Sequence, residues 1–392
     1  MVESRLRVSR YRWVVLLATF YTFVAFAFAF QEAPPLMDSI MQEFDISSHA
    51  EAGLLMSIVM IPGIFLGIPV GALVGRYGVK FTGFTSTVLI AGGCFLTSTA
   101  NSFMMTLIGR LILGVGGVLV TTTMPAVISQ WFSSKDLGKA MGIYGINMPL
   151  ATVIAFPTAS MLLLSHGWRY PFYISTIIGT TAMVVFTVMV KEGPLKHREN
   201  GQRLSIRDAL RNVEIWKVGL VWLLFSASTL SFTTWAPNLF TNYKSMDEVY
   251  ASFLASVVML AAIPCVPVYG WVSDRIGRRK PLIMTGFILI TLALIAAGYT
   301  SNLALTASIV TMGVAAAMVP PLASALLAEI SGPSLAGVSF GVMVICQNTG
   351  ATLGPLLIGY VIDVTQSLPL SFLGILMLSA AGAVVAYALK TR

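Results

Sequence analysis

The chain has 392 residues, of which 56% are hydrophobic and 10% are charged, and its mean hydropathy is +0.84. Soluble domains carry about 25% charged residues, so this composition excludes a soluble globular protein. A formal net charge of +8 suits a nucleic-acid partner in a soluble protein. Here the basic residues lie in the connections between apolar stretches, so no nucleic-acid partner is predicted.

Apolar stretches of about 20 residues, long enough to cross a bilayer, recur along the whole chain. Membrane helices are predicted at 12–40, 50–74, 81–98, 103–126, 138–163, 170–190, 216–240, 250–269, 281–299, 304–328, 336–361 and 370–389. None of these stretches alternates apolar and polar residues as a strand of a membrane barrel does. The sequence therefore predicts an all-α membrane protein with twelve transmembrane helices, six on each side of a polar stretch at residues 191–214.

Lysine and arginine are concentrated on one side of the predicted membrane. That side holds both termini, the loop at 76–80, the polar stretch at 191–217 and the run at 275–280. The opposite side holds Arg169 and Lys244 together with acidic residues, which are Asp38, Glu43, Asp45, Asp247 and Glu248. The positive-inside rule therefore predicts a multi-pass protein of the cell membrane with both termini in the cytoplasm.

The polar stretch at 191–214 is predicted to be a cytoplasmic linker. It contains a capping-box pattern from Ser205 to Asp208, which predicts a short helix at the membrane surface. Its basic residues are expected to contact anionic lipid headgroups.

A loop motif occurs twice, at an offset of 199 residues. The first copy is Gly71-Ala-Leu-Val-Gly75-Arg76-Tyr-Gly78-Val-Lys80, and the second is Gly270-Trp-Val-Ser-Asp274-Arg275-Ile-Gly277-Arg278-Arg279. Each copy follows the second predicted helix of its half. The glycines are expected to let the backbone reverse and two helices approach, and the arginines to bind carbonyl ends or headgroups.

With twelve spans, two loop motifs and a central polar stretch, the chain resembles the major facilitator superfamily over essentially its full length. The resemblance implies two pseudo-symmetric six-helix bundles, at 1–190 and 215–392, around a central cavity that opens alternately to each side. The first motif has Gly75 where the family usually has Asp, so a charge latch built from that Asp is not expected in the N-terminal half.

Two ionisable residues lie inside predicted spans, where a charge costs about 2.5–3.5 kcal/mol on insertion scales. Arg110 shares one face of the fourth helix with Gly114, Gly117 and Thr121, and Glu32 lies in the outer half of the first helix. The arginine with its glycines looks like a family motif associated with proton transfer. A Glu32–Arg110 pair would couple proton binding to occupation of the cavity. Alternatively, Arg110 caps backbone carbonyls and Glu32 is hydrated at the outer mouth.

Several polar and aromatic residues are predicted to contact the substrate. The offset of 199 residues maps Glu32 onto Ser231 and Arg110 onto Ile309, so the predicted site is asymmetric. The candidates are Tyr21, Phe28, Gln31, Thr121, Asn147, Ser228, Ser231, Trp235, Ser324, Gln347 and Asn348. Hydroxyl groups in membrane helices often bond to their own backbone, and that interpretation stays open for the serines and threonines.

The eleventh helix contains the pattern Gly341-x8-Gly350-x3-Gly354-Pro355, which resembles a motif of proton-driven exporters in the family. The family carries it in the fifth helix, and the fifth helix of this chain does not keep the pattern. An antiporter is therefore not indicated, and close helix packing explains these glycines.

Missing motifs narrow the function further. The sequence has no P-loop, no Gly-x-Ser-x-Gly and no His-Glu-x-x-His, so ATP-driven transport, an enzyme, a metal site and a cofactor are not predicted. The second and eighth helices offer no pair of arginines to the cavity, which disfavours nitrate or phosphate but leaves a monocarboxylate open.

The main hypothesis is a monomeric, proton-coupled secondary transporter of a small organic solute. The alternatives are an exporter of lipophilic or cationic compounds, a transporter of a small monocarboxylate, and a transporter-like ligand sensor.

Overall fold

The computed structural model describes residues 2–194 and 211–389, and its described part is helical without a strand. The N-terminal half comprises α1 (Val2–Gln31), the 3-10 helix η1 (Pro34–Leu36), α2 (Met37–Glu43), α3 (His49–Ser98), α4 (Phe103–Trp131), α5 (Ser134–Tyr144), α6 (Asn147–His166) and α7 (Arg169–Met189). The C-terminal half comprises α9 (Val213–Lys244), α10 (Glu248–Ile276), α11 (Lys280–Tyr299), α12 (Asn302–Ala316), α13 (Val319–Thr365) and α14 (Leu368–Tyr387). Twelve described segments are long and apolar enough to cross a membrane, which confirms the predicted fold.

Two predicted loops are shorter than expected because helix continues through them. α3 contains both the second and the third span, and only Gly78 (φ 80°, ψ 163°) interrupts its helical backbone. α13 contains the end of the tenth span and the whole eleventh span. The short helix predicted in the linker falls on residues 195–210, outside the described residues.

Proline pairs break two of the spans. Because proline has no N–H, Pro34 and Pro35 cannot bond to the carbonyls of Phe30 and Gln31, and α1 ends at Gln31. Pro320 and Pro321 lie in the same way just after the end of α12. The fifth span is also broken, between α5 and α6 at residues 145–146, and Pro149 has no N–H to bond to the carbonyl of Gly145 four residues earlier. The tenth span is therefore broken at the prolines that the sequence pointed to.

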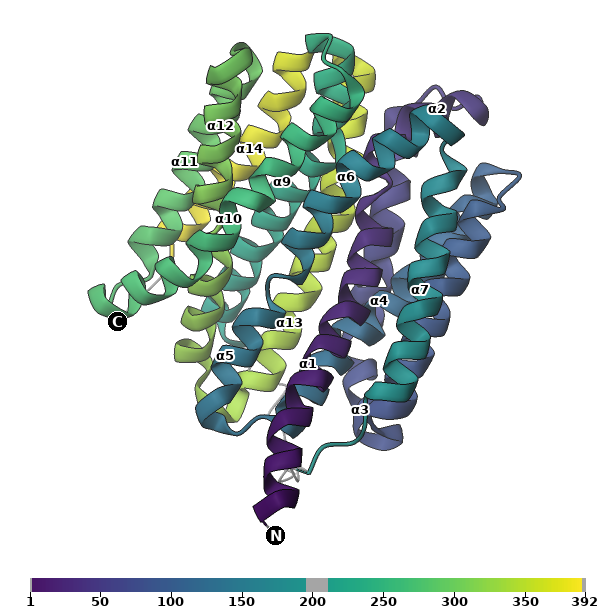
Figure 1. The fold of residues 1–392 in the computed structure, drawn as a ribbon. Helices are drawn as coiled ribbons and strands as arrows, with labels where there is room; N and C mark the ends of the chain where they lie inside the picture. The colour runs from purple at the N-terminus through teal and green to yellow at the C-terminus, as the bar shows by residue number, and fades with distance from the viewer. Residues whose placement is uncertain (1, 195–210, 390–392) are drawn as a thin grey trace.

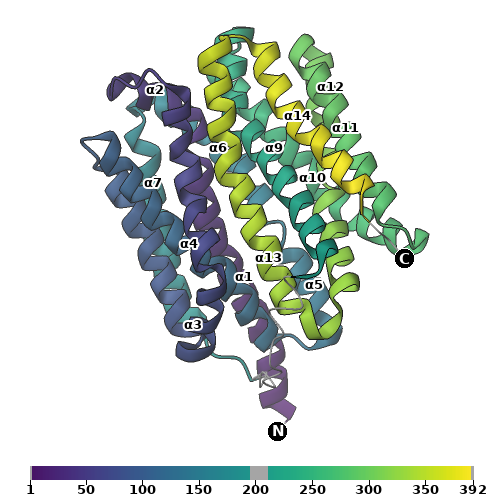
Figure 2. The same ribbon diagram turned by 180° about the vertical axis from the view of Figure 1, so that it is seen from behind.

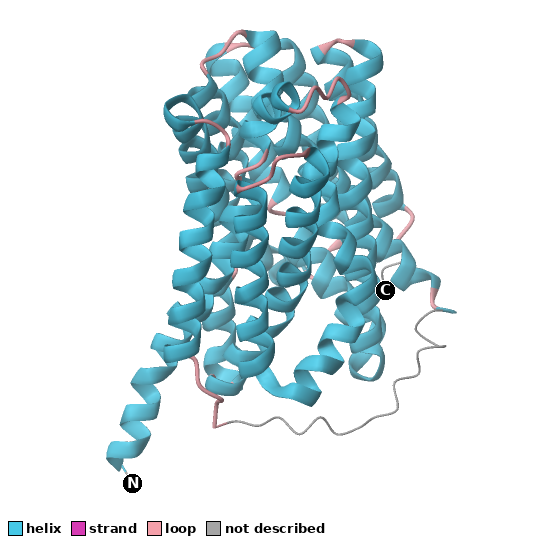
Figure 3. Cartoon of the chain, turned by 90° about the vertical axis from the view of Figure 1, so that its right-hand side faces the viewer, coloured by secondary structure: helices cyan, strands magenta, loops and turns pink. Residues whose placement is uncertain are grey.

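The helices run roughly side by side in two groups, with α1, α3, α4 and α7 in one and α9 to α12 and α14 in the other (Figures 1 and 2). α13 packs along both α9 and α3, and α6 packs on both α1 and α10, so these two helices lie where the halves meet. Figure 3 shows α1 extending beyond the bundle at its N-terminal end. We call the end of the bundle with Arg76, Lys80 and Lys280 the basic end, and the end with Asp38 and Glu248 the acidic end.

Candidate functional site

Arg110 lies in the first half of α4 and is fully buried. Its guanidinium donates from Nε to the carbonyl of Leu55 in α3 at 2.8 Å. At the end of α1, Nη1 donates to the carbonyl of Ala29 at 2.7 Å and Nη2 to that of Phe30 at 3.0 Å. The Phe30 carbonyl needs an outside donor because Pro34, four residues later, has no N–H. Arg110 therefore ties α4 to α3 and to the proline break in α1.

Glycines bring these helices close enough for the bonds. A side chain in place of Gly114 would overlap the backbone of Val59 in α3, and one in place of Gly117 would overlap the ring of Phe26 in α1. The groove of small residues beside Arg110 is therefore filled by neighbouring helices. Thr121, further along the same face, is exposed.

Glu32 lies just after α1 and is also fully buried. Its Oε2 accepts a hydrogen bond from the hydroxyl of Ser175 in α7 at 2.6 Å. Its Oε1 has no hydrogen-bond partner among the described residues. The carboxyl group thus points into the N-terminal half, between α1 and α7, with one oxygen unsatisfied.

Glu32 and Arg110 are the two charged side chains that are buried in the described part of the chain. They are close enough to interact electrostatically. No hydrogen bond or ion pair is found between them among the described contacts, since Arg110 donates to carbonyls and Glu32 accepts from Ser175. In this structure Arg110 caps carbonyls, as one alternative held, whereas Glu32 is fully buried and not exposed at the outer mouth.

Other polar atoms along α1 and the broken fifth span are only partly satisfied. Gln31 donates from Nε2 to Thr152 of α6 at 2.7 Å, and its Oε1 has no partner among the described residues. Asn147 accepts from the N–H of Met148 at 2.6 Å, and its side-chain amide lies close to the hydroxyl of Tyr144, with no other described partner for Nδ2 or for that hydroxyl. These buried atoms can offer hydrogen bonds to a solute.

The serines predicted to bind substrate on α9 bond to their own helix. Ser228 donates to the carbonyl of Phe225 at 3.0 Å, and Ser231 donates to that of Ala227 at 2.5 Å. Both carbonyls lie about one turn earlier in α9. The local-bonding alternative therefore describes these two serines here.

Trp235 and Asn348 lie where the halves meet. The Nε1 of Trp235 donates to the carbonyl of Pro355 in α13 at 2.9 Å, and its ring lies 5.7 Å from that of His49 in α3. The amide of Asn348 occupies the space that a side chain at Gly63 of α3 would need. These two side chains thus contribute to contacts between helices.

The remaining predicted residues are spread over several environments. The hydroxyl of Tyr21 is 2.6 Å from that of Thr181 in α7, and Phe28 is buried in the core. Ser324 and Gln347 are half-buried on α13. Glu32 contacts α7 and Gln31 contacts α6, so the structure does not gather the predicted residues into one site.

The equivalent glycines of the two loop motifs share a positive φ. φ is 80° at Gly78 and 67° at Gly277, a backbone conformation that favours glycine. A side chain at Gly71 or Gly270 would meet no heavy atom within 4 Å. The expectation that these two glycines bring helices together is therefore wrong for this structure. The side chain of Asp274 lies outside the described residues.

Lys80, at the end of the first motif, and Lys280, one residue past the second, bind the last carbonyls of a neighbouring helix. Lys80 donates to the carbonyls of Thr187 at 2.7 Å and Val190 at 2.8 Å, at the end of α7. Lys280 donates to the carbonyl of Leu389, just after α14, at 2.8 Å. The offset of 199 residues maps Lys80 onto Arg279, which pairs with Glu329, so the two lysines make similar contacts from positions that are not equivalent in the repeat. The motif arginines lie over aromatic rings, Arg76 over Tyr77 and Arg275 over Trp271.

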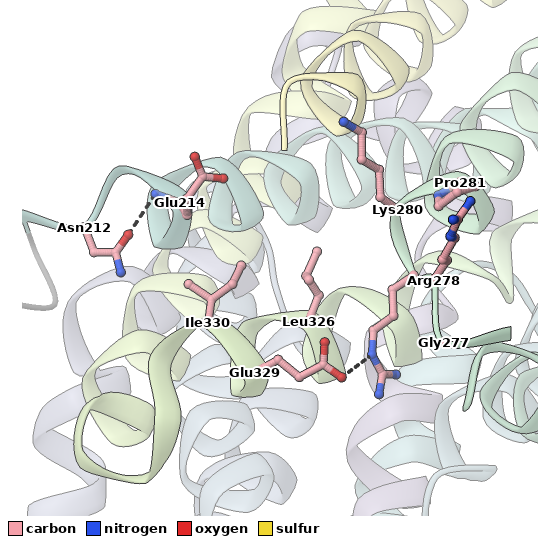
Figure 4. A pocket seen from close by; sticks show the side chains of 10 residues that line it. Asn212, Glu214, Gly277, Arg278, Lys280, Pro281, Leu326, Glu329 and Ile330 are labelled. Atoms are coloured by element: carbon pink, nitrogen blue, oxygen red, sulfur yellow. Dashed lines mark hydrogen bonds and ion pairs between the residues drawn. The ribbon is translucent and has the colours of Figure 1, made fainter. Parts of the chain in front are cut away.

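Arg278 lines a pocket of about 760 Å³ at the basic end of the C-terminal half (Figure 4). An ion pair between Arg279 and Glu329, with N and O 2.7 Å apart, lies on its wall. All its lining residues belong to the C-terminal half, and none is a predicted substrate contact. This pocket is therefore not a cavity between the halves.

The halves are joined at the acidic end by residues that sequence reasoning missed. Asp363 of α13 accepts from the backbone N–H of His49 at 2.7 Å and of Ala50 at 3.1 Å, and from the hydroxyl of Ser48 at 2.8 Å. It also pairs with Nδ1 of His49 at 2.7 Å. A carboxylate from one half thus caps the first turn of α3 in the other half. The sequence signal was the carboxylate of Asp363 next to an apolar run. The predicted eleventh helix ended at residue 361 and so did not include it.

Two more hydrogen-bonded contacts cross between the halves at this end. Ser160 of α6 donates to Ser252 of α10 at 2.6 Å. Asp38 accepts from Asn238 and, at 3.0 Å, from Asn242 of α9. Small polar residues are frequent in membrane helices, so the sequence could not indicate which of them contact one another across the halves.

A family model described as Major Facilitator Superfamily matches residues 14–251 and 236–392. The relatives include a probable nitrate transporter, NarT, of Staphylococcus epidermidis, which is 27% identical over 346 residues and is matched over 86% of each chain. They also include a hexuronate transporter of Bacillus subtilis, 22% identical over 347 residues, with 83% of this chain and 82% of the relative covered.

The chain is also similar to solved transporter structures. One is a bacterial homolog to the human lysosomal transporter Spinster, in an inward-facing and occupied conformation, with a TM-score of 0.81, 16% identity and 97% of both chains covered. Another is a variant of the nucleoside transporter NupG, with a TM-score of 0.80, 15% identity, and 96% of this chain and 98% of that chain covered. At these identities the likeness shows the fold.

Proposed function

Since the chain belongs to the major facilitator superfamily and is a multi-pass membrane transporter of a small solute, we propose a coupling mechanism for it. Transport of an organic solute is coupled to protons through Glu32. The observation that carries the proposal is the buried carboxyl of Glu32, with one oxygen bonded to Ser175 and the other unpartnered. Arg110 does not bond to it, because that guanidinium is held by backbone carbonyls.

A buried carboxylate without a bonded cation is unfavourable, and a proton on the unpartnered oxygen removes the charge. Release of that proton requires a conformation in which water or another base reaches Glu32. Proton affinity then differs between two conformations, which is the condition for coupling. Arg110 supports this step indirectly, since it holds the break in α1 that positions Glu32.

Alternating access is supported by the uneven contacts between the halves. Asp363, Ser160 and Asp38 hold hydrogen bonds across the halves at the acidic end. At the basic end, Gly71 and Gly270 border open space. Closure at one end with space at the other fits rocking of the halves about a central site.

The substrate class follows from the charges available to hold it. The NarT relative is named for nitrate and the hexuronate transporter for a sugar acid, both of them anions. Among the described residues the one buried cation is Arg110, and its bonded donors already serve carbonyls. We therefore favour a neutral organic solute over nitrate.

A small monocarboxylate is the second candidate substrate. It is favoured by the name of the hexuronate relative and by the Nδ2 of Asn147 and hydroxyl of Tyr144, which can donate to a carboxylate.

The test uses purified protein in proteoliposomes. Neutral sugars, nucleosides, hexuronates and nitrate are first ranked by thermal shift, and uptake of the best ligand is then measured under an imposed pH gradient. We expect uptake to follow the gradient and Glu32→Gln to reduce the gradient-driven part by about tenfold or more. Equal gradient dependence in this variant and the original chain would refute coupling through Glu32.

Glu51→Gln is the matched control, because Glu51 is an exposed carboxylate in the first turn of α3. It should leave the gradient dependence unchanged. Neutral-solute uptake in the absence of a gradient separates a loss of coupling from a loss of transport.

A further inference from the structure

A small cavity of about 30 Å³ lies between the two halves at the acidic end. Polar residues from both halves line it, namely Asp38 and Ser39 from the N-terminal half and Asn238, Thr241, Glu248 and Ser252 from the C-terminal half. The space is large enough for a species the size of one water molecule. It closes only when the two halves meet.

Two oxygen atoms at this cavity have no donor among the described residues. One is Oδ1 of Asn238, whose side chain is buried with a residue exposure of only 5%. The other is Oε2 of Glu248. A buried acceptor without a partner is unfavourable, so a positive or donating species is favoured in the space beside them.

The charges around the cavity are also unbalanced. Glu248 lies near enough to Asp38 and Asp247 for repulsion between the carboxylates. Asp38 accepts hydrogen bonds from Asn238 and Asn242, which are neutral. The carboxylates of Asp38 and Glu248 therefore approach each other across the halves, and no positively charged side chain lies between them among the described residues.

The basic residues of the acidic end are bonded elsewhere. Arg169 pairs with Glu43, and Lys244 donates to the carbonyl of Thr300, between α11 and α12. His49 pairs with Asp363, and the ring of His166 is stacked on that of a neighbouring tyrosine. None of these four side chains neutralises the cavity.

We propose that this cavity binds one hard, singly charged cation of the size of sodium. Carboxylate, amide and hydroxyl oxygens are ligands for hard cations, and the space has no room for a hydrated magnesium ion. The cavity is lined by two carboxylates, and no cluster of three or more His, Cys, Asp and Glu side chains that would suit a metal occurs among the described residues. Two carboxylates with neutral oxygens suit a singly charged cation. Because both halves supply oxygens, the cation stabilises the conformation closed at the acidic end.

Thermal unfolding of the purified full-length protein tests the proposal, at constant pH and ionic strength, with choline chloride replaced stepwise by sodium chloride. We expect a saturable rise in Tm with sodium. Glu248→Gln and Asp38→Asn should weaken the apparent affinity for sodium by about tenfold or more. Asp45→Asn, an exposed acidic residue at the same end that does not line the cavity, should behave like the original chain.

Direct binding of ²²Na⁺ to the unaltered protein is the second measurement, so the proposal stays testable if a variant fails to fold. Saturable ²²Na⁺ binding that excess unlabelled sodium displaces and choline does not would support it. An equal rise in Tm with choline, no ²²Na⁺ binding, or tighter stabilisation by calcium would each overturn it. So would a rise in Tm on acidification alone, which would identify a proton as the occupant. Neither measurement uses a solute or a pH gradient, so failure here leaves the role of Glu32 untouched.

Discussion

Arg110 shows how a membrane protein can bury a cation without an anionic partner. Its planar guanidinium reaches three carbonyls on two helices. Carbonyl oxygens at a helix end carry partial negative charge, so several of them together can replace one carboxylate. The rigid fork of donors in arginine suits this task, and the compact ammonium of lysine does not.

Replacement of Arg110 by Lys should therefore destabilise the fold. We expect Arg110→Lys to lower the free energy of unfolding by about 2 kcal/mol or more, because at least one buried carbonyl loses its donor. Thermal and denaturant unfolding in detergent measure the change. Arg76→Lys is the control, since Arg76 is exposed and only stacks on Tyr77, and a change within about 0.5 kcal/mol is expected there. Equal effects of the two changes would contradict the capping role of Arg110.

At the scale of helices, the contact between α3 and α13 combines close packing with a charged cap. A side chain at Gly359 of α13 would overlap the backbone of His49, so this glycine lets α13 reach the start of α3. Asp363 then caps that helix start. Within the C-terminal half, Gly350 and Gly354 bring α13 equally close to α9, which confirms the packing explanation for the eleventh-helix glycines.

A disulfide across the acidic end should report on its opening. The hydroxyls of Ser160 and Ser252 are 2.6 Å apart, so we expect the double variant Ser160→Cys with Ser252→Cys to cross-link under mild oxidation and to lose transport until it is reduced. The single variants serve as controls. Adding Asp363→Asn should slow cross-linking, because the neutral amide caps α3 less well than the carboxylate. Cross-linking that is as fast with Glu51→Gln as with Asp363→Asn would contradict the role of the cap.

At the scale of the whole molecule, charge distinguishes the two ends of the bundle. The basic end carries the lysines that cap α7 and the end of α14, and the acidic end carries the carboxylates that join the halves. The positive-inside rule places the basic end in the cytoplasm. This orientation remains a prediction.

Cysteine labelling in intact cells tests the orientation. In a background without the three native cysteines, a membrane-impermeant maleimide should label Asp45→Cys at once and Arg278→Cys only after permeabilisation. Both positions are exposed, so the membrane alone decides access. The reverse pattern would show that the basic end faces outward.

Much of the fold could be predicted because a segment inside the bilayer must be apolar and must satisfy its own backbone hydrogen bonds. A span needs about 20 apolar residues, so the twelve spans are visible in local composition. The motif repeat likewise pointed to Gly78 and Gly277, which both have a positive φ. Helix ends were less predictable: the predicted gap at 75–80 is mostly helix in α3, because packing rather than polarity decides where a helix stops.

The site was predictable only in part. Glu32 and Arg110 could be identified because a charge inside a span is rare, but their partners could not. Ser175 lies 143 residues from Glu32, and Leu55 lies 55 residues from Arg110. An uncharged serine and a backbone carbonyl also carry no distinguishing sequence signal.

By itself, the sequence determined which segments cross the membrane and which charges are buried, because the cost of transfer into lipid depends on the residues of one segment. Only the tertiary structure decided what those charges bond to. In the structure Glu32 and Arg110 are neighbours that bond to separate partners, and Asp363 of α13 caps the first turn of α3. The physical reason is that a hydrogen bond forms over about 3 Å, and only helix packing brings residues from distant segments within that range.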